Sequence, residues 1–140
     1  MFGRWAALLL PALLAPALSG CMPMAQAAPV VDARAQGAAL AQSCAAREGW
    51  GDAAPPARIF GNVYYVGTCG ITVLLITSPR GHILIDAATQ DAVPSILANI
   101  RTLGFDPHDV KYLLNSHEHI DHAGGFAALK RATGAQLLAR

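Results

Sequence analysis

The chain has 140 residues, a formal net charge of +1 and a pI of about 7.8. A near-neutral chain lacks the basic footprint of a nucleic-acid-binding protein, so we expect no nucleic-acid partner. Hydrophobic residues make up 54% of the chain, and many of them lie at the N-terminus.

The N-terminal segment has the composition of a secretory signal peptide. One basic side chain, Arg4, precedes an Ala/Leu/Pro run from Trp5 to Leu18. This run is shorter than the roughly 20 residues of a membrane-spanning helix, and Pro11 and Pro16 disfavour a buried helix. We therefore predict that residues 1–27 direct export and that the mature protein is periplasmic.

Two cleavage positions fit this segment. The sequence Leu-Ser-Gly-Cys ending at Cys21 resembles the bacterial lipoprotein box, in which the cysteine is lipidated. The sequence Ala-Gln-Ala at 25–27 fits the ordinary signal peptidase instead. The first would anchor the protein to the membrane through Cys21, and the second would release it. The sequence leaves both alternatives open.

Export would place the three cysteines in an oxidising compartment. If Cys21 is lipidated, Cys44 and Cys69 are left as an even number. The two alternatives for them are a disulfide bond and two separately buried thiols.

Residues 28–56 form an Ala-rich N-terminal extension with a weak helical pattern around 38–46, which Pro55 and Pro56 end. Short apolar runs separated by turn residues follow. We expect strands at 58–60, 63–66, 71–77 and 82–86. Because short turns link them, they predict an antiparallel meander.

The clearest predicted helix covers residues 91–103. Its apolar side chains recur at helical spacing, from Val93 to Leu103. Asp91 is expected to cap its start and Gly104 to close its end. A strand at 110–114, a helix at 125–132 and a strand at 135–139 follow, which is a layered α/β pattern.

The six residues from His117 to His122 read His-Glu-His-Ile-Asp-His, and three of the five histidines lie here. Imidazole and carboxylate are zinc ligands in catalytic sites. Residues two apart in an extended loop point the same way, so we expect His117 and His119 to bind one metal. Asp121 and His122 are expected to diverge and to serve a second metal.

A catalytic zinc keeps about three protein ligands and one open position. Two ligands per metal are too few, so at least one more per ion is expected from beyond Arg140. The stretch is not the His-Glu-x-x-His motif of helical metalloproteases, because Asp121 stands where that motif needs histidine. A purely structural zinc is disfavoured because no cysteine lies near.

At this point the residues resemble a known family. His-x-His-x-Asp-His after an apolar strand is similar to the signature of the metallo-β-lactamase superfamily, and residues 84–86, Leu-Ile-Asp, resemble its early aspartate motif. Segments that resemble subclass B3 in particular are 58–68, 81–86, 99–101 with 103–105, and 116–125.

The resemblance implies an α/β fold, the αββα sandwich, of which residues 57–140 would supply only the first half. It implies two Zn²⁺ ions: His117 and His119 would hold the first, Asp121 and His122 the second, and each would gain a later histidine. Asp121 would also orient the attacking water.

Other residues take supporting roles in the same resemblance. Cys44 and Cys69 resemble a disulfide pair found in some members. Asp86 would lie at a strand end near the metals. From the chemistry of zinc sites rather than from the resemblance, Ser116 and Asn115 would orient the metal ligands; the alternative is that they only cap the loop backbone.

The implied reaction is zinc-dependent hydrolysis of the β-lactam ring of antibiotics, a small-molecule substrate, and it would give antibiotic resistance. A chain with half of the fold is expected to be inactive alone. Two alternatives stay open: another hydrolase of the superfamily, such as an exported lactonase, and a non-catalytic truncated remnant. The sequence predicts no oligomeric state.

Overall fold

A computed structural model describes residues 32–138 of the chain. The predicted signal segment, with Cys21 and both cleavage positions, lies outside these residues. Within them, no helix is long and apolar enough to cross a membrane.

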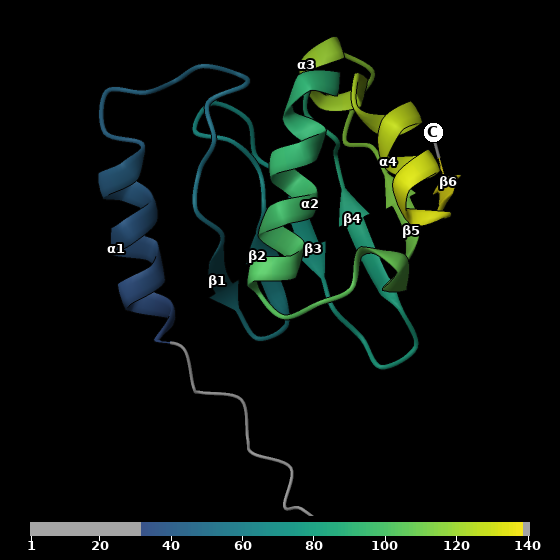
Figure 1. The fold of residues 1–140 in the computed structure, drawn as a ribbon, viewed down its shortest axis with the longest axis horizontal. Coiled ribbons are helices and arrows are strands. Elements are labelled where there is room, and N and C mark those ends of the chain that lie inside the picture. The colour runs from purple at the N-terminus through teal and green to yellow at the C-terminus, as the bar shows by residue number, and fades with distance from the viewer. Residues whose placement is uncertain (1–31, 139–140) are drawn as a thin grey trace, which may run out of the picture.

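One six-stranded sheet forms the centre of the structure, with its strands in chain order (Figure 1). The first four strands pair antiparallel, as the short turns predicted, and the last three pair parallel. The strands are β1 (Ala57–Phe60), β2 (Val63–Tyr65), β3 (Leu74–Ile76), β4 (His82–Ile85), β5 (Val110–Leu114) and β6 (Gln136–Leu138).

Strand β3 is shorter than the predicted run at 71–77. Residues 67–72 form a loop, in which the N–H of Thr68 donates to the carbonyl of Ile71 at 3.0 Å. The β-branched composition of this run predicted strand throughout, but the hydrogen bonds inside the loop take the backbone out of the sheet.

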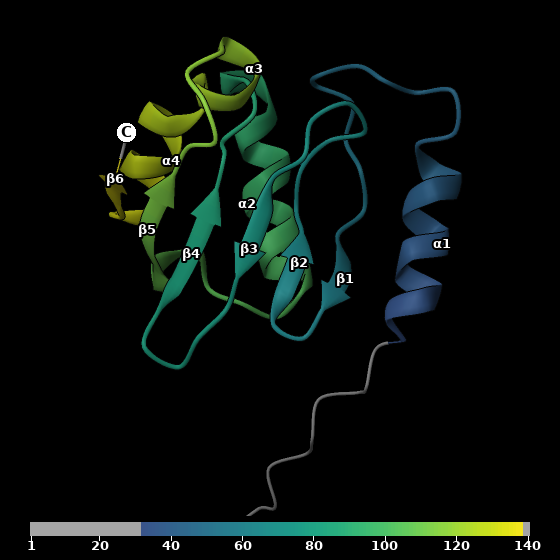
Figure 2. The same cartoon turned by 180° about the vertical axis from the view of Figure 1, so that it is seen from behind.

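Parallel strands need crossover helices between them. The crossovers are α2 (Val93–Thr102), between β4 and β5, and α4 (Phe126–Thr133), between β5 and β6. Both lie on the same face of the sheet, and no described helix covers the opposite face (Figure 2). This layer of helices on one sheet is the half-sandwich that we expected.

The core lies between the sheet and these helices. On this face strands β3, β4 and β5 each contribute a fully buried leucine that packs with α2 and α4. The buried residues are Leu75, Leu84 and Leu113 of the strands, Ile96 and Ile100 of α2, and Leu129 of α4. On the opposite face Tyr112 pairs with Ile83 and keeps 42% of its surface exposed. The sheet therefore has one packed face and one apolar face that is partly exposed.

The predicted helix at 91–103 is divided. A 3₁₀ turn, η1 (Gln90–Ala92), precedes α2, and Asp91 makes no cap because Ala92 holds the N-cap position. The Asp91 cap was therefore wrong. Gly104 does end the helix, with a φ of +86°, a conformation that glycine adopts without strain.

The first helix, α1 (Ala33–Ser43), lies apart from the other helices, beside β1 (Figure 1). It begins earlier than the weak pattern at 38–46 predicted, because Asp32 caps it by accepting the N–H of Arg34 at 2.9 Å.

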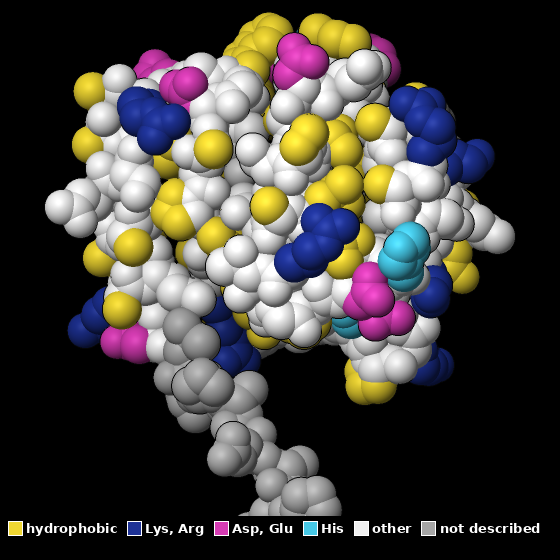
Figure 3. Space-filling model, viewed as in Figure 1, with side chains coloured by type: hydrophobic (Ala, Val, Ile, Leu, Met, Phe, Trp, Pro, Cys, Tyr) yellow, Lys and Arg dark blue, Asp and Glu magenta, His cyan; other side chains and the backbone are white. Residues whose placement is uncertain are grey.

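On the face drawn in Figure 3, acidic and basic side chains are scattered and form no broad patch of one sign.

Asn99 is a buried polar residue in the middle of α2, with 7% of its surface exposed. Its side-chain Nδ2 donates to the carbonyls of Ala54 at 3.0 Å, Val66 at 3.1 Å and Gly67 at 3.4 Å. Through this one amide the helix holds two loops that are distant in sequence.

We expect Asn99→Asp to lower the free energy of unfolding by at least about 2 kcal/mol. Aspartate keeps the shape of asparagine but at neutral pH carries only acceptors. Buried acceptors without partners cost about 1–3 kcal/mol each. Urea denaturation of the full-length protein measures the change, with Arg101→Gln on the exposed side of the same helix as control. Equal stability of Asn99→Asp and the control would contradict the assignment.

Candidate metal centre

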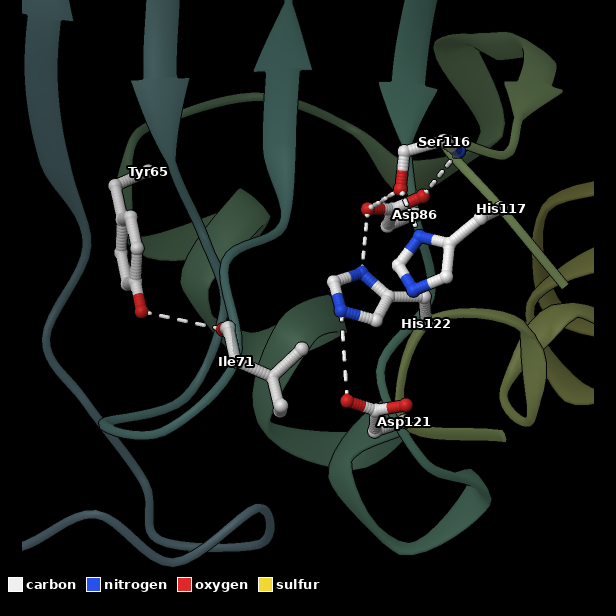
Figure 4. Close-up of polar contacts among 7 residues, drawn as sticks. All are labelled: Tyr65, Ile71, Asp86, Ser116, His117, Asp121 and His122. Carbon is white, nitrogen blue, oxygen red and sulfur yellow. Dashed lines mark hydrogen bonds and ion pairs between the residues drawn. The ribbon is translucent and has the colours of Figure 1, made fainter. Parts of the chain in front are cut away.

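The histidine-rich stretch lies at one edge of the sheet, where the parallel strands β4 and β5 end (Figure 4). Ligand and active sites in α/β sheets form at such carboxyl ends. Asp86 follows β4 directly, and its N–H donates to the carbonyl of Leu114 at the end of β5 at 2.8 Å. The two strand ends are thus joined next to the site.

The second half of the stretch is a helical turn, α3 (Ile120–Ala123), with His119 at its N-cap. The sequence predicts an extended loop in which Asp121 and His122 diverge. Neighbouring residues on a helix are about 100° apart, and here Oδ2 of Asp121 lies 3.4 Å from Nε2 of His122. The two side chains therefore approach each other.

Three of the four predicted ligands form one group. The ligand atoms of His117, Asp121 and His122 all lie within 4.8 Å of one another. The ring of the fourth, His119, is exposed and lies beside that of His117, with centroids 4.8 Å apart. The structure thus gathers the four predicted residues at one place, with His119 at its rim.

Asp86 supports this group through hydrogen bonds. It is almost completely buried and accepts three hydrogen bonds: from the N–H of Ser116 at 2.7 Å, from the Ser116 hydroxyl at 2.8 Å and from Nδ1 of His122 at 2.8 Å. Burial by itself would raise the pKa of Asp86, but these hydrogen bonds outweigh it and lower the pKa below its usual value. Asp86 is therefore a carboxylate at neutral pH.

This carboxylate sets the tautomer of both neighbouring histidines. His122 must carry its proton on Nδ1 to donate to Asp86. The Ser116 hydroxyl gives its only proton to Asp86, so its oxygen accepts the Nδ1 proton of His117 at 2.9 Å. In the neutral form of each ring, Nε2 then carries the lone pair that a metal ligand requires.

The donor set therefore fits a zinc ion. Histidine ligands usually donate their second ring N–H to a carboxylate or a similar acceptor, and both His117 and His122 do so. The N–H and the hydroxyl of Ser116 both donate to Asp86, and the hydroxyl oxygen also contacts Nδ1 of His117. That Ser116 orients a bound metal ligand stays a prediction.

The turn after β4 holds α3 in place through its backbone. The N–H of Ala87 donates to the carbonyl of His122 at 2.8 Å, and the N–H of Gly125 donates to that of Ala88 at 2.9 Å. Asp86 and Ala88 have φ values of +64° and +51°, each of which costs roughly 1–2 kcal/mol in an L-residue. Surrounding contacts offset this strain, and nothing in the sequence indicated it.

Across from the metal ligands lies the loop at 67–72 (Figure 4). The Tyr65 hydroxyl donates to the carbonyls of Thr68 and Ile71. Burial raises the pKa of Tyr65, with a hydrogen bond to Thr72 opposing it in part, so the hydroxyl keeps its proton at neutral pH. A disulfide joins Cys69 of this loop to Cys44. Sequence reasoning included Tyr65 only in a resemblance and missed this role.

A family model described as the metallo-beta-lactamase superfamily matches residues 66–140, more than half of the chain. The chain belongs to the metallo-β-lactamase superfamily. The match covers the Asp86 turn and the whole metal-ligand stretch, and it confirms the resemblance on which the ligand assignments rest.

Solved metallo-β-lactamases share the fold of this superfamily chain. MIM-1 from Novosphingobium pentaromativorans is 57% identical, with a TM-score of 0.69 over 71% of this chain and 37% of its own. MEM-A1, a subclass B3 enzyme from a soil metagenome library, is 50% identical, with a TM-score of 0.62 over 64% of this chain and 34% of its own. The α/β fold and the likeness to subclass B3 are thereby confirmed.

Curated relatives by sequence are lactonases. N-acyl homoserine lactonase AttM of Azorhizobium caulinodans is 31% identical over 45% of this chain and 32% of the lactonase. AiiA of Bacillus thuringiensis subsp. kurstaki is 38% identical over 37% of this chain and 20% of the lactonase. The chain thus spans about a third or less of the length of these relatives.

Proposed function

We propose that the full-length protein containing this chain is an exported, zinc-dependent hydrolase that opens the β-lactam ring of antibiotics. Residues 57–140 would form the first half of its catalytic domain, and two later histidines would complete the metal sites. The observation that carries the proposal is the set of hydrogen bonds that joins Asp86 to His122 directly and to His117 through Ser116. In neutral rings these bonds leave Nε2 of both histidines available to a metal. Solved β-lactamases at 57% and 50% identity support the choice of substrate.

Each residue of the site has a definable task in this reaction. His117, His119, Asp121 and His122 would hold two zinc ions. Zinc bound there would supply a Lewis acid and would lower the pKa of water to about 7. The Asp121 carboxylate would accept a hydrogen bond from the attacking water and so orient it. Asp86 and Ser116 would keep the imidazoles in one tautomer and one orientation throughout turnover.

A lactonase is the second candidate, because the curated relatives are N-acyl homoserine lactonases. Both reactions open a small ring by attack of water on an acyl carbon, so the described ligands would serve either. The two differ in the leaving atom, which is nitrogen in a β-lactam and oxygen in a lactone. The higher identity to solved β-lactamases favours the β-lactam.

Chelation of zinc in the full-length protein is expected to abolish carbapenem ring opening, and adding Zn²⁺ is expected to restore it. The protein would be expressed from the longest reading frame that contains this chain. Ring opening in periplasmic extract would be measured as the loss of carbapenem absorbance. An N-acyl homoserine lactone would be the parallel substrate.

The outcomes separate the candidates. Chelator-sensitive opening of the carbapenem alone supports the β-lactamase. Opening of the lactone alone, by a protein carrying its full complement of zinc, would replace it with the lactonase. A soluble protein that binds no zinc would leave the non-catalytic remnant.

A further inference from the structure

The loop at 67–72 lies at the same edge of the sheet as the metal ligands. At this edge one residue of each strand pairs with the next across the sheet: Tyr65 of β2, Leu74 of β3, Ile85 of β4 and Leu114 of β5. The loop joins the first two of these strands, the Asp86 turn follows the third, and the metal-ligand stretch follows the fourth. The loop therefore lies on one side of the Asp86 turn and the metal ligands lie on the other (Figure 4).

One hydroxyl group, that of Tyr65, holds both ends of this loop. It donates to the carbonyl of Thr68 and, at 3.2 Å, to that of Ile71, and it is also hydrogen-bonded to the side chain of Thr72. Two further bonds close the loop on itself, since the N–H of Thr68 donates to Ile71 and the N–H of Ile71 donates to Oγ1 of Thr68, both at 3.0 Å. The Tyr65 ring belongs to β2, so the loop takes its shape from the sheet.

Other parts of the chain fix the loop from outside. The Nδ2 of Asn99 in α2 donates to the carbonyl of Gly67 at 3.4 Å. The N–H of Cys69 donates to the carbonyl of Asp52 at 2.8 Å, and its sulfur is joined to Cys44. Sheet, helix and N-terminal extension thus all hold one short loop. A loop that a rigid scaffold positions in this way is typical of a binding site.

A fixed loop in this place has a definable use in ring opening. The metal ligands can act on the acyl carbon of a substrate, but they do not orient the rest of the molecule. Substrate-positioning groups hold the reacting atoms in place, and a misplacement of about 1 Å can cost roughly 10²-fold in rate. Contacts that are equally strong in the bound substrate and the transition state lower KM without changing kcat.

We propose that Tyr65 is a positioning residue for the substrate: its hydroxyl fixes the loop at 67–72, which forms the side of the substrate site across from the metal ligands. The inference rests on the proposed function, and the substrate is the cyclic amide or ester that the zinc site opens. The loop meets the part of the substrate remote from the acyl carbon. Tyr65 therefore sets KM, while kcat and metal content depend on the ligand stretch.

The test is Tyr65→Phe in the full-length, zinc-loaded protein, with Tyr64→Phe as the matched control. Tyr64 is the neighbouring residue of β2, and its ring packs edge-on against Phe105 with centroids 5.2 Å apart. We expect Tyr65→Phe to raise KM at least about tenfold, with kcat within about threefold and zinc content unchanged. The control should keep both constants. An unchanged KM, or a fall in kcat together with zinc content, would overturn the proposal.

Hydrogen exchange tests the same role without any substrate. The amides of Thr68 and Ile71 should exchange at least about tenfold faster in Tyr65→Phe, because the loop that protects them loses its central bond. Amides of β4 and β5 should stay protected, which separates a loosened loop from general unfolding. Unchanged exchange of the two loop amides would overturn the role of Tyr65 whatever the kinetics show.

A second variant moves the loop while leaving Tyr65 intact. A Cβ at Gly70 would overlap with the carbonyl oxygen of Glu48, whereas a Cβ at Gly51 meets nothing within 4 Å. Gly70→Ala should therefore raise KM as Tyr65→Phe does, and Gly51→Ala should not. Wild-type protein that opens neither a carbapenem nor an N-acyl homoserine lactone would overturn the proposed function and this inference together. Active wild type with unchanged KM in both loop variants would overturn this inference alone.

Discussion

Replacing His117 with alanine or Asp121 with asparagine in the full-length protein should lower kcat/KM for a carbapenem by at least about 10³-fold, or ~4 kcal/mol of transition-state stabilisation. The ligand atoms of these residues and of His122 lie within 4.8 Å of one another. Either change therefore removes one predicted metal ligand from this group. Asp121→Asn also replaces the carboxylate that would orient the attacking water with a neutral amide.

Glu118→Gln is the matched control. Glu118 lies in the same loop, directly after His117, and its side chain is exposed. The control should keep activity within a few-fold and its full metal content. Steady-state kinetics together with metal analysis by mass spectrometry separate loss of zinc from loss of chemistry. If either ligand variant kept most of the activity of the control, the ligand assignments would be wrong.

Local patterns predicted the framework of this structure well. The limits of β5 are those predicted at 110–114, and the four-strand meander follows from apolar runs separated by turn residues. The buried side of α2 was visible in the spacing of Ile96 and Ile100. These features depend on residues close in sequence, so the sequence contains the information directly.

The contacts that hold the site are not local, and for that reason the sequence showed them poorly. The Asn99 amide bonds a carbonyl 45 residues away, and Asp86 bonds Ser116 across 30 residues. Nothing near Asn99 distinguishes it from a solvated helix residue. Asp86 was found only through a resemblance, since its hydrogen bonds depend on how β4 and β5 pair. Likewise, the helical turn α3 brings Asp121 towards His122, whereas the alternation of side chains along an extended loop predicted that the two would diverge.

Gly125→Ala should strongly destabilise the turn beside the site. A Cβ at Gly125 would overlap with the carbonyl oxygen of Ala87 and lie 2.9 Å from Cγ2 of Val93. Both neighbours are buried, so neither can move without disturbing the core. Overpacking of this kind costs about 1–3 kcal/mol, and we expect a loss near the upper end in the free energy of unfolding.

The damage should reach the metal centre because of where Gly125 is bonded. Its N–H donates to Ala88 in the turn that holds Asp86, so displacement of Gly125 would shift the carboxylate that fixes the tautomers of His117 and His122. Zinc affinity should therefore fall together with stability, by roughly 10- to 100-fold if the supporting hydrogen bonds are lost.

Gly37→Ala is the control, since a Cβ there meets nothing within 4 Å. In the middle of α1 that change should stabilise the protein by about 0.5–1 kcal/mol and leave zinc binding unaltered. Urea denaturation and zinc titration of both variants measure the two effects. A Gly125→Ala protein as stable as wild type would show that the turn and α3 are not held together as the structure has them, and an unstable protein with normal zinc affinity would separate the fold of this turn from the metal centre.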